Sequence, residues 1–187
     1  MAVTTLDPKT ALILVDLQNG IVAYPTVHPA SDVVQRAAAL AGAFRDHGLP
    51  VVLVNVTGGA PGRTEQGRSL GDLPAGWADI VPELNQQPQD HTVTKRTWGA
   101  FTGSGLDAHL KQLGVTQVVI AGVSTSIGVE STARQAYEHG FHVTLAVDAM
   151  TDTNPDAHIN STTRIFPRLG ESGSTRGIID LLDKRSA

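Results

Sequence analysis

Two charged residues stand at the ends of short apolar runs, where a folded chain would partly bury them. Asp16 closes the run ALILVD, and Lys95 closes the shorter run HTVTK. A carboxylate at the end of a buried strand is partly desolvated yet open to a ligand, which suits acid or base chemistry. Asp16 could equally cap the following turn through backbone amides. Strand alternation leaves open whether Lys95 or Arg96 points inward.

A third candidate is the stretch of small residues GVSTSIGVEST, residues 122–132. Small residues let the backbone approach a ligand, and amides at a helix N-terminus stabilise developing negative charge. Gly122 and Gly128 could instead serve only tight strand-to-helix packing. Ser124 does not fit the G-x-S-x-G pattern of serine hydrolases, because the residue two positions on is Ser126. A hydrolase using either serine is therefore the weaker hypothesis.

The elements that must position these residues alternate along the chain. Runs rich in Val, Ile and Leu alternate with helical patterns, which is typical of βαβ units. The predicted strands are 11–16, 50–56, 91–96, 116–122, 141–150 and a weak one near 170–174. The predicted helices are 32–48, capped by Ser31 or Asp32, then 104–114, 126–139, one opened by Asn154 and Pro155, and 174–184.

This order predicts an α/β fold with three αβα layers and a doubly wound, mostly parallel, Rossmann-like sheet of five to six strands. We expect one domain over residues 1–187, since the chain is long enough for one substantial core. Ligands of such sheets bind at the carboxyl ends of the strands. The long irregular stretch 57–90 is expected to cover a site there.

Several further side chains are expected near the strand ends. The predicted substrate-binding residues are Asn55, Trp98, Phe101, Val123 and Ser124. Trp98 and Phe101 could equally be ordinary core residues. Two arginines of the long loop, Arg63 and Arg68, could pair with a substrate carboxylate or be solvated loop charges.

Composition narrows the range of partners. The net charge is -4 and basic residues are scattered, so nothing favours a nucleic-acid partner. The N-terminal apolar run is far shorter than the roughly 20 residues that span a bilayer, so we expect neither export nor a membrane partner. The chain has no cysteine, which excludes disulfides, thiolate metal sites and a thiol nucleophile. Cytoplasmic localisation is the default expectation, and no cofactor is expected.

Three ordered motifs carry a family resemblance: ALILVDLQNG, KRTWGAFTGSGLDAHLKQLGV and VVIAGVSTSIGVESTARQAYEHGF. Together they resemble the isochorismatase-like hydrolases, which include nicotinamidases and other cysteine amidohydrolases, over almost the whole chain. The resemblance implies a catalytic set of the first-strand aspartate, the lysine before W-x-A-F and a cysteine in the turn after the fourth strand. By motif these positions are Asp16, Lys95 and Gly128. The resemblance also implies a non-proline cis peptide bond between Val123 and Ser124, and a homodimer or homotetramer.

Glycine at position 128 is a departure from the amidohydrolase pattern. Without sulfur, the route through an acyl group on the enzyme is closed. The resemblance implies a second chemistry, in which the aspartate protonates the carbon of a vinyl ether and water traps the resulting cation. We therefore predict a hydrolase of a small, anionic metabolite that uses Asp16 as general acid and Lys95 as its electrostatic partner. The alternative is a non-catalytic descendant that binds a small molecule or acts only as an oligomeric partner.

No metal is expected. Metal-binding relatives carry Asp-x-His and further histidines after the second strand, whereas this chain reads NVTGGAPGRTEQGR there. Its seven histidines are dispersed without H-x-x-x-H spacing.

Overall fold

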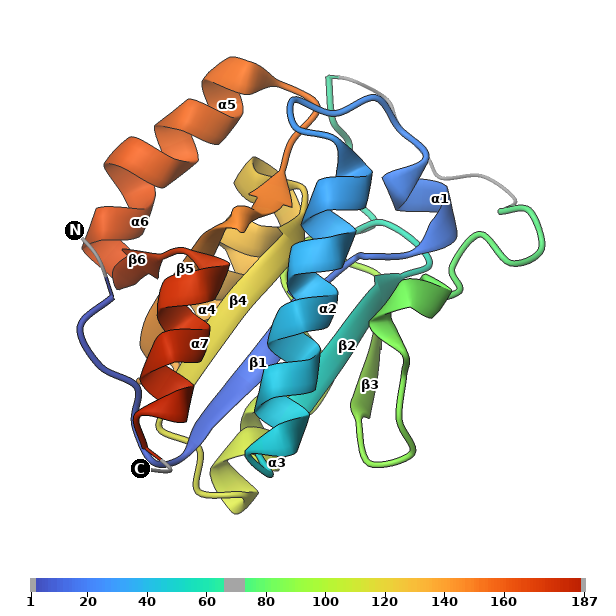
Figure 1. Ribbon diagram of the computed structural model, residues 1–187. Coiled ribbons are helices and arrows are strands. Elements are labelled where there is room, and N and C mark those ends of the chain that lie inside the picture. The colour runs from blue at the N-terminus through green and yellow to red at the C-terminus, as the bar shows by residue number, and fades with distance from the viewer. Residues whose placement is uncertain (1–2, 66–72, 186–187) are drawn as a thin grey trace.

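The computed structural model describes residues 3–65 and 73–185 and is built on one parallel sheet (Figure 1). The six strands follow the order β3-β2-β1-β4-β5-β6. Their bounds are β1 Thr10–Val15, β2 Val51–Val56, β3 His91–Lys95, β4 Gln117–Val123, β5 His142–Thr151 and β6 Glu171–Gly173. All pairs are parallel, which confirms the predicted doubly wound α/β fold.

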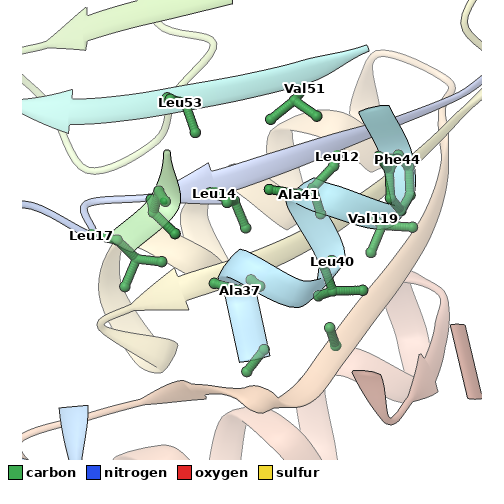
Figure 2. Close-up of a cluster of buried hydrophobic side chains, with 14 of the residues drawn as sticks. Leu12, Leu14, Leu17, Ala37, Leu40, Ala41, Phe44, Val51, Leu53 and Val119 are labelled. Carbon is green, nitrogen blue, oxygen red and sulfur yellow. The ribbon is translucent and has the colours of Figure 1, made fainter. Parts of the chain in front are cut away.

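The central strand β1 explains why its sequence is uniformly apolar. All six of its residues are buried, because helices cover both faces of a doubly wound sheet. Leu12 and Leu14 point into one core cluster, and Ile13 and Val15 point into the other. Figure 2 shows the first cluster, in which Leu12 and Leu14 face a helix that carries Leu40 and Phe44.

Helices cover the two faces of the sheet in separate sets. Figure 1 shows α2 (Ala30–Asp46) and α7 (Thr175–Asp183) in front of the strands, with α4 (Glu130–Glu138) behind them. The remaining short helical segments are α1 Asn19–Val22, η1 Pro82–Leu84, α3 Leu106–Gln112, η2 Thr125–Val129, α5 Pro155–Asn160, η3 Ser161–Ile165 and α6 Phe166–Leu169. In the described part of the chain, no helix is both long and apolar enough to cross a membrane.

Some predicted boundaries shift, and one cap is wrong. Helix α2 begins at Ala30 after Pro29, with no side-chain cap, so neither Ser31 nor Asp32 caps it. The carbonyl of Pro29 accepts the first hydrogen bonds of this helix, from the amides of Asp32 and Val33, so Ser31 and Asp32 already lie inside its first turn. By contrast, Asn154 caps α5 as predicted, since its side chain accepts hydrogen bonds from two backbone amides.

The predicted helix 126–139 is in fact two segments. A wider helical turn, η2, covers Thr125–Val129, and α4 follows directly from Glu130. In the second segment, the hydroxyl of Thr132 bonds the carbonyl of Gly128, a local side-chain bond that sequence periodicity does not reveal. Neither α1 nor η1 was predicted, because each is a single turn within a stretch of sequence that has no helical periodicity.

The chain order reverses between β1 and β4, which is the switch point where such sheets form a ligand crevice. Val15 at the end of β1 pairs with Gly122 near the end of β4, so Asp16 and the corner after β4 lie at the same edge. Gly122 has φ +125, and a Cβ there would overlap the carbonyl oxygen of Val15. Only glycine lets these two strand ends approach so closely.

This contact predicts opposite effects for the same substitution at two glycines. Gly122→Ala must move the Val15 backbone, and we expect it to lower the free energy of unfolding by about 3 kcal/mol or more. Gly42→Ala in α2 meets no atom within 4 Å, and we expect it to raise stability by roughly 0.5–1 kcal/mol. Urea unfolding measures the change in stability of both variants. Equal changes would show that the contact between Gly122 and Val15 does not require glycine.

Candidate active site

Asp16 and Lys95 meet at the switch point. Asp16 follows the last residue of β1, and Lys95 is the last residue of β3, two strands away. The ammonium nitrogen of Lys95 lies 2.7 Å from Oδ2 of Asp16 and also donates to the carbonyl oxygen of Thr97 at 3.2 Å. Both charged side chains are buried. The sheet thus brings together two residues 79 positions apart.

The backbone at Asp16 turns sharply to present the carboxyl group. Its φ is 53, in the left-handed region, while its amide still donates to the carbonyl of Val54 at 2.9 Å. Aspartate tolerates this region better than most residues. The alternative in which Asp16 only caps a turn does not describe its side chain, because Oδ2 is bonded to Lys95.

The structure settles which of two neighbouring cations points inward. Lys95 is buried, whereas Arg96 is exposed and lies across the backbone of Gly58 in the loop after β2. A Cβ at Gly58 would come within 3.0 Å of Nε of Arg96. Within the described ranges, Arg96 forms no ion pair with a carboxylate.

Burial decides the protonation of Asp16. Desolvation raises the pKa of Asp16 from 3.8 to about 6, although the charge and hydrogen bond of Lys95 lower it. Its second oxygen, Oδ1, is buried and has no hydrogen-bond partner among the described residues. An unpaired buried oxygen disfavours the ionised form further. Asp16 can therefore hold a proton close to neutral pH.

Gly128 faces the same carboxyl group. A Cβ built on Gly128 would lie 3.1 Å from Oδ2 of Asp16, 3.0 Å from Cγ1 of Val15 and 3.3 Å from the carbonyl oxygen of Val123. Gly128 is not in the left-handed region, so its backbone would accept a side chain. The structure thus brings Asp16, Lys95 and Gly128 together, as the resemblance implies.

The corner after β4 is held by hydrogen bonds to Asp152, which follows β5, and to His158 in α5. The peptide bond between Val123 and Ser124 is cis, as the resemblance implies. Ser126 donates to Oδ2 of Asp152 through both its amide (2.7 Å) and its hydroxyl (2.8 Å). Thr125 shares a 2.9 Å hydrogen bond with Nδ1 of His158. The Ser126 hydroxyl is therefore paired with a carboxylate and not with a histidine base.

The other predicted substrate-binding side chains lie in different surroundings, and their contact with a substrate stays a prediction. Trp98 is 64% exposed, while Phe101 is buried and packs against Phe141 and His139 in the core. The core-packing alternative therefore describes Phe101. The Val123 side chain is also buried in the core, and only its carbonyl faces Gly128. Ser124 is half-buried at the corner.

Asn55 has a structural partner of its own. Its amide donates to the carbonyl of Ala78 at 2.9 Å, while its Oδ1 is buried without a partner among the described residues. Of the two loop arginines, Arg63 is exposed and Arg68 lies outside the described residues. A substrate contact for these three residues stays a prediction.

Sequence reasoning missed the residue that closes the edge beside Asp16. Gln18 is fully buried, and its amide both donates to and accepts from the backbone of Val56. It also donates to the carbonyl of Trp77, so it ties β2 to the segment that covers α1. The available signal was a polar residue three positions after the last residue of an apolar strand, in VDLQNG.

A metal site finds no ligand set here. Among the residues that the structure describes, no three His, Asp or Glu side chains are placed to share a metal ion. The loop after β2 offers no histidine. The expectation of a metal-free protein stays a prediction.

The doubly wound sheet and the buried Asp–Lys pair at its switch point are the fold and site of an isochorismatase-like hydrolase. The Isochorismatase domain model matches residues 10–176, and the chain belongs to this family. It is 42% identical over 180 residues to the isochorismatase family protein YwoC of Bacillus subtilis (strain 168), covering 92% of this chain and 93% of that one.

Two further relatives extend the comparison. The structure of an isochorismatase family protein from Burkholderia thailandensis superposes with a TM-score of 0.92 at 41% identity, over 96% of this chain and 98% of that one. Streptothricin hydrolase of Streptomyces noursei is 34% identical over 140 residues, which is 74% of this chain and 48% of that protein.

The raised pKa of Asp16 predicts a pH-dependent stability difference. The folded state binds the proton more tightly than the unfolded state, so this carboxyl group lowers stability as pH rises from about 4 to about 6. The difference in unfolding free energy, wild type minus Asp16→Asn, should therefore fall by about 2 kcal/mol between pH 4 and pH 7, which is less than the full pKa shift because the unfolded carboxyl group is already about half ionised at pH 4. Denaturant unfolding at several pH values measures it. A constant difference would show that the pKa is not raised.

Proposed function

We propose that this protein hydrolyses the vinyl ether of a small, anionic metabolite, with Asp16 as general acid and no covalent intermediate. The observation that carries the proposal is a buried carboxyl group with a pKa raised to about 6, facing a position that has no side chain. A general acid works best with a pKa near the working pH. A position without a side chain supplies no nucleophile.

The proposed reaction follows from that acid. Protonated Asp16 donates its proton to the terminal carbon of the vinyl ether, and the electrons of the double bond form the new C–H bond. Positive charge then develops on the ether oxygen and its neighbouring carbon. Water adds to that carbon and loses a proton, and the resulting hemiketal releases an alcohol and a ketone. Asp16 takes up a proton to complete the cycle.

Lys95 is proposed to stabilise Asp16 after the proton leaves. The 2.7 Å contact to Oδ2 offers a positive charge to the carboxylate at that moment. Because Oδ2 already accepts from Lys95, the unpaired Oδ1 is the oxygen better suited to carry the acidic proton. The low-dielectric surroundings of this buried pair strengthen the attraction between the Lys95 ammonium and the Asp16 carboxylate.

Exposed Arg96 supports an anionic substrate. Its guanidinium group is unpaired among the described carboxylates and lies at the ends of β2 and β3, where Thr57 donates to the carbonyl of Lys95. Arginine recognises carboxylates through paired N–H donors.

The proposal also includes a homodimer or homotetramer and a cytoplasmic localisation.

The rival function is a non-catalytic binder of small molecules, which the absence of a side chain at position 128 favours. Turnover separates the two. We expect the wild type to release pyruvate from isochorismate, and Asp16→Asn to lose at least about 100-fold in kcat/KM, the typical contribution of a general acid. Circular dichroism checks that the variant folds. Asp148→Asn is the control. The carboxylate of Asp148 accepts a hydrogen bond from Thr175, so this variant should retain turnover.

Wild-type turnover should also follow the ionisation of Asp16. Since only the protonated acid is active, kcat/KM should be level below about pH 6 and fall tenfold per pH unit above it. Absence of turnover at any pH would favour the binder. Turnover that rises with pH would instead make Asp16 a base.

Restoring a thiol at the corner tests whether the acyl-transfer geometry survives. In Gly128→Cys, the new Cβ needs its neighbours to move by a few tenths of an ångström, and we expect a loss of about 1–3 kcal/mol in stability. The thiol would lie beside Asp16, which could take its proton. We expect slow hydrolysis of activated esters, with an acyl adduct on residue 128 seen by mass spectrometry. Gly128→Ser is the control with a weaker nucleophile, and no adduct on the cysteine would contradict this geometry.

A further inference from the structure

Helix α4 contacts both halves of the site through a buried hydroxyl. Thr132 donates to the carbonyl of Gly128 at 2.7 Å and accepts from the amide of Ala100 at 3.1 Å. The side chain is completely buried. A threonine hydroxyl often bonds the carbonyl four residues earlier in a helix, so the first contact alone would be unremarkable. The second joins α4 to a different segment, the one that follows Lys95.

A second side chain of α4 holds the same segment. Gln135 accepts from the amide of Phe101 at 3.0 Å and donates to the hydroxyl of Thr102 at 2.6 Å. Its amide group occupies the space beside Gly99, where a Cβ would overlap it. Two α4 side chains therefore bind three consecutive residues, 100–102, next to a glycine that gives them room.

The segment that α4 holds is in turn bonded to the ammonium group of Lys95. Nζ of Lys95 donates to the carbonyl of Thr97, and the hydroxyl of Thr97 donates to the carbonyl of Gly99 at 3.1 Å. The ammonium thus has two acceptors, Asp16 and Thr97. Displacing residues 97–102 would move the second acceptor and change how Lys95 reaches the first.

We propose that Thr132 and Gln135 act as positioning residues, which hold the segment 97–102 so that Lys95 stays against Asp16 and the corner at Gly128 stays beside both. Neither residue touches the reacting atoms. The catalytic consequence rests on the function proposed above. The positioning itself does not, because it can be measured on the carboxyl group without turnover.

The experiment reads the Asp16 carboxyl carbon by ¹³C NMR during a pH titration, with Asp16→Asn used for assignment. Among the described residues, Lys95 is the charged side chain in contact with Asp16, and this contact lowers the pKa of Asp16. Thr132→Val and Gln135→Leu should therefore raise the pKa of Asp16 by about 1 unit, because an opposite charge at this distance is worth about that much. Thr132→Ser, which keeps the hydroxyl, should restore the wild-type titration.

Thr144→Val is the matched control. Thr144 is also a fully buried threonine in a side-chain hydrogen bond, with Gln117, but it lies at the other end of the sheet. It should lower the melting temperature and leave the Asp16 titration unchanged. If Thr132→Val fails to fold, Gln135→Leu and Gly99→Ala, which displaces the Gln135 amide, take its place.

Two results are decisive. A raised Asp16 pKa in the α4 variants but not in Thr144→Val supports the proposal. An active enzyme should then also lose about tenfold in kcat with KM unchanged at pH 5, where Asp16 is protonated in every variant, because Lys95 no longer stabilises the carboxylate as the proton leaves. An Asp16 titration that matches the wild type in all folded α4 variants overturns it and leaves Thr132 and Gln135 as packing residues. Absence of turnover in the wild type would count against the proposed function and not against the positioning.

Discussion

The contact between the Lys95 ammonium and the Asp16 carboxyl group is the interaction on which the rest of the site depends. Removing two charges from water costs several kcal/mol for each ion, and mutual attraction offsets this only when the geometry is good. Here Lys95 has two acceptors, whereas one oxygen of Asp16 has no partner among the described residues. The ammonium is therefore better satisfied than the carboxylate. This imbalance favours a protonated acid.

The fold produces this imbalance by geometry. The reversal of strand order places the end of β1 between β2 and β4, and Gly122 lets the end of β4 come into contact with Val15. Asp16 then turns with a left-handed backbone, and η2, which leads into α4, places Gly128 beside its carboxyl group. In a relative with a cysteine at that position, the same space would hold sulfur. In this chain it is bounded by a carboxyl oxygen, a valine methyl and a backbone carbonyl.

The sequence was informative where one physical effect dominates. Apolar runs predicted the inner strands β1, β2, β4 and β5 because both faces of the sheet are buried, whereas the edge strands β3 and β6 are more polar and gave a shorter or weaker pattern. The predicted strand bounds differ from the structure by about one residue. Asp16 could be nominated because a charge at the end of a buried strand is unusual, whereas only the family resemblance selected Lys95 over Arg96. The direction of the Asp16 pKa could not be predicted, since it depends on how closely desolvation and Lys95 balance. The roles of Gln18, Thr132 and Gln135 also escaped prediction, because their partners are backbone groups distant in the sequence.

Asp16 is expected to hold a proton close to neutral pH while it contacts an ammonium group. The most direct measurement is the infrared C=O stretch of a protonated carboxylic acid, assigned to this residue by its loss in Asp16→Asn. We expect this band to be strong at pH 5 and half lost near pH 6. A band already absent at pH 5 would show that Lys95 keeps Asp16 ionised, and would contradict its role as an acid.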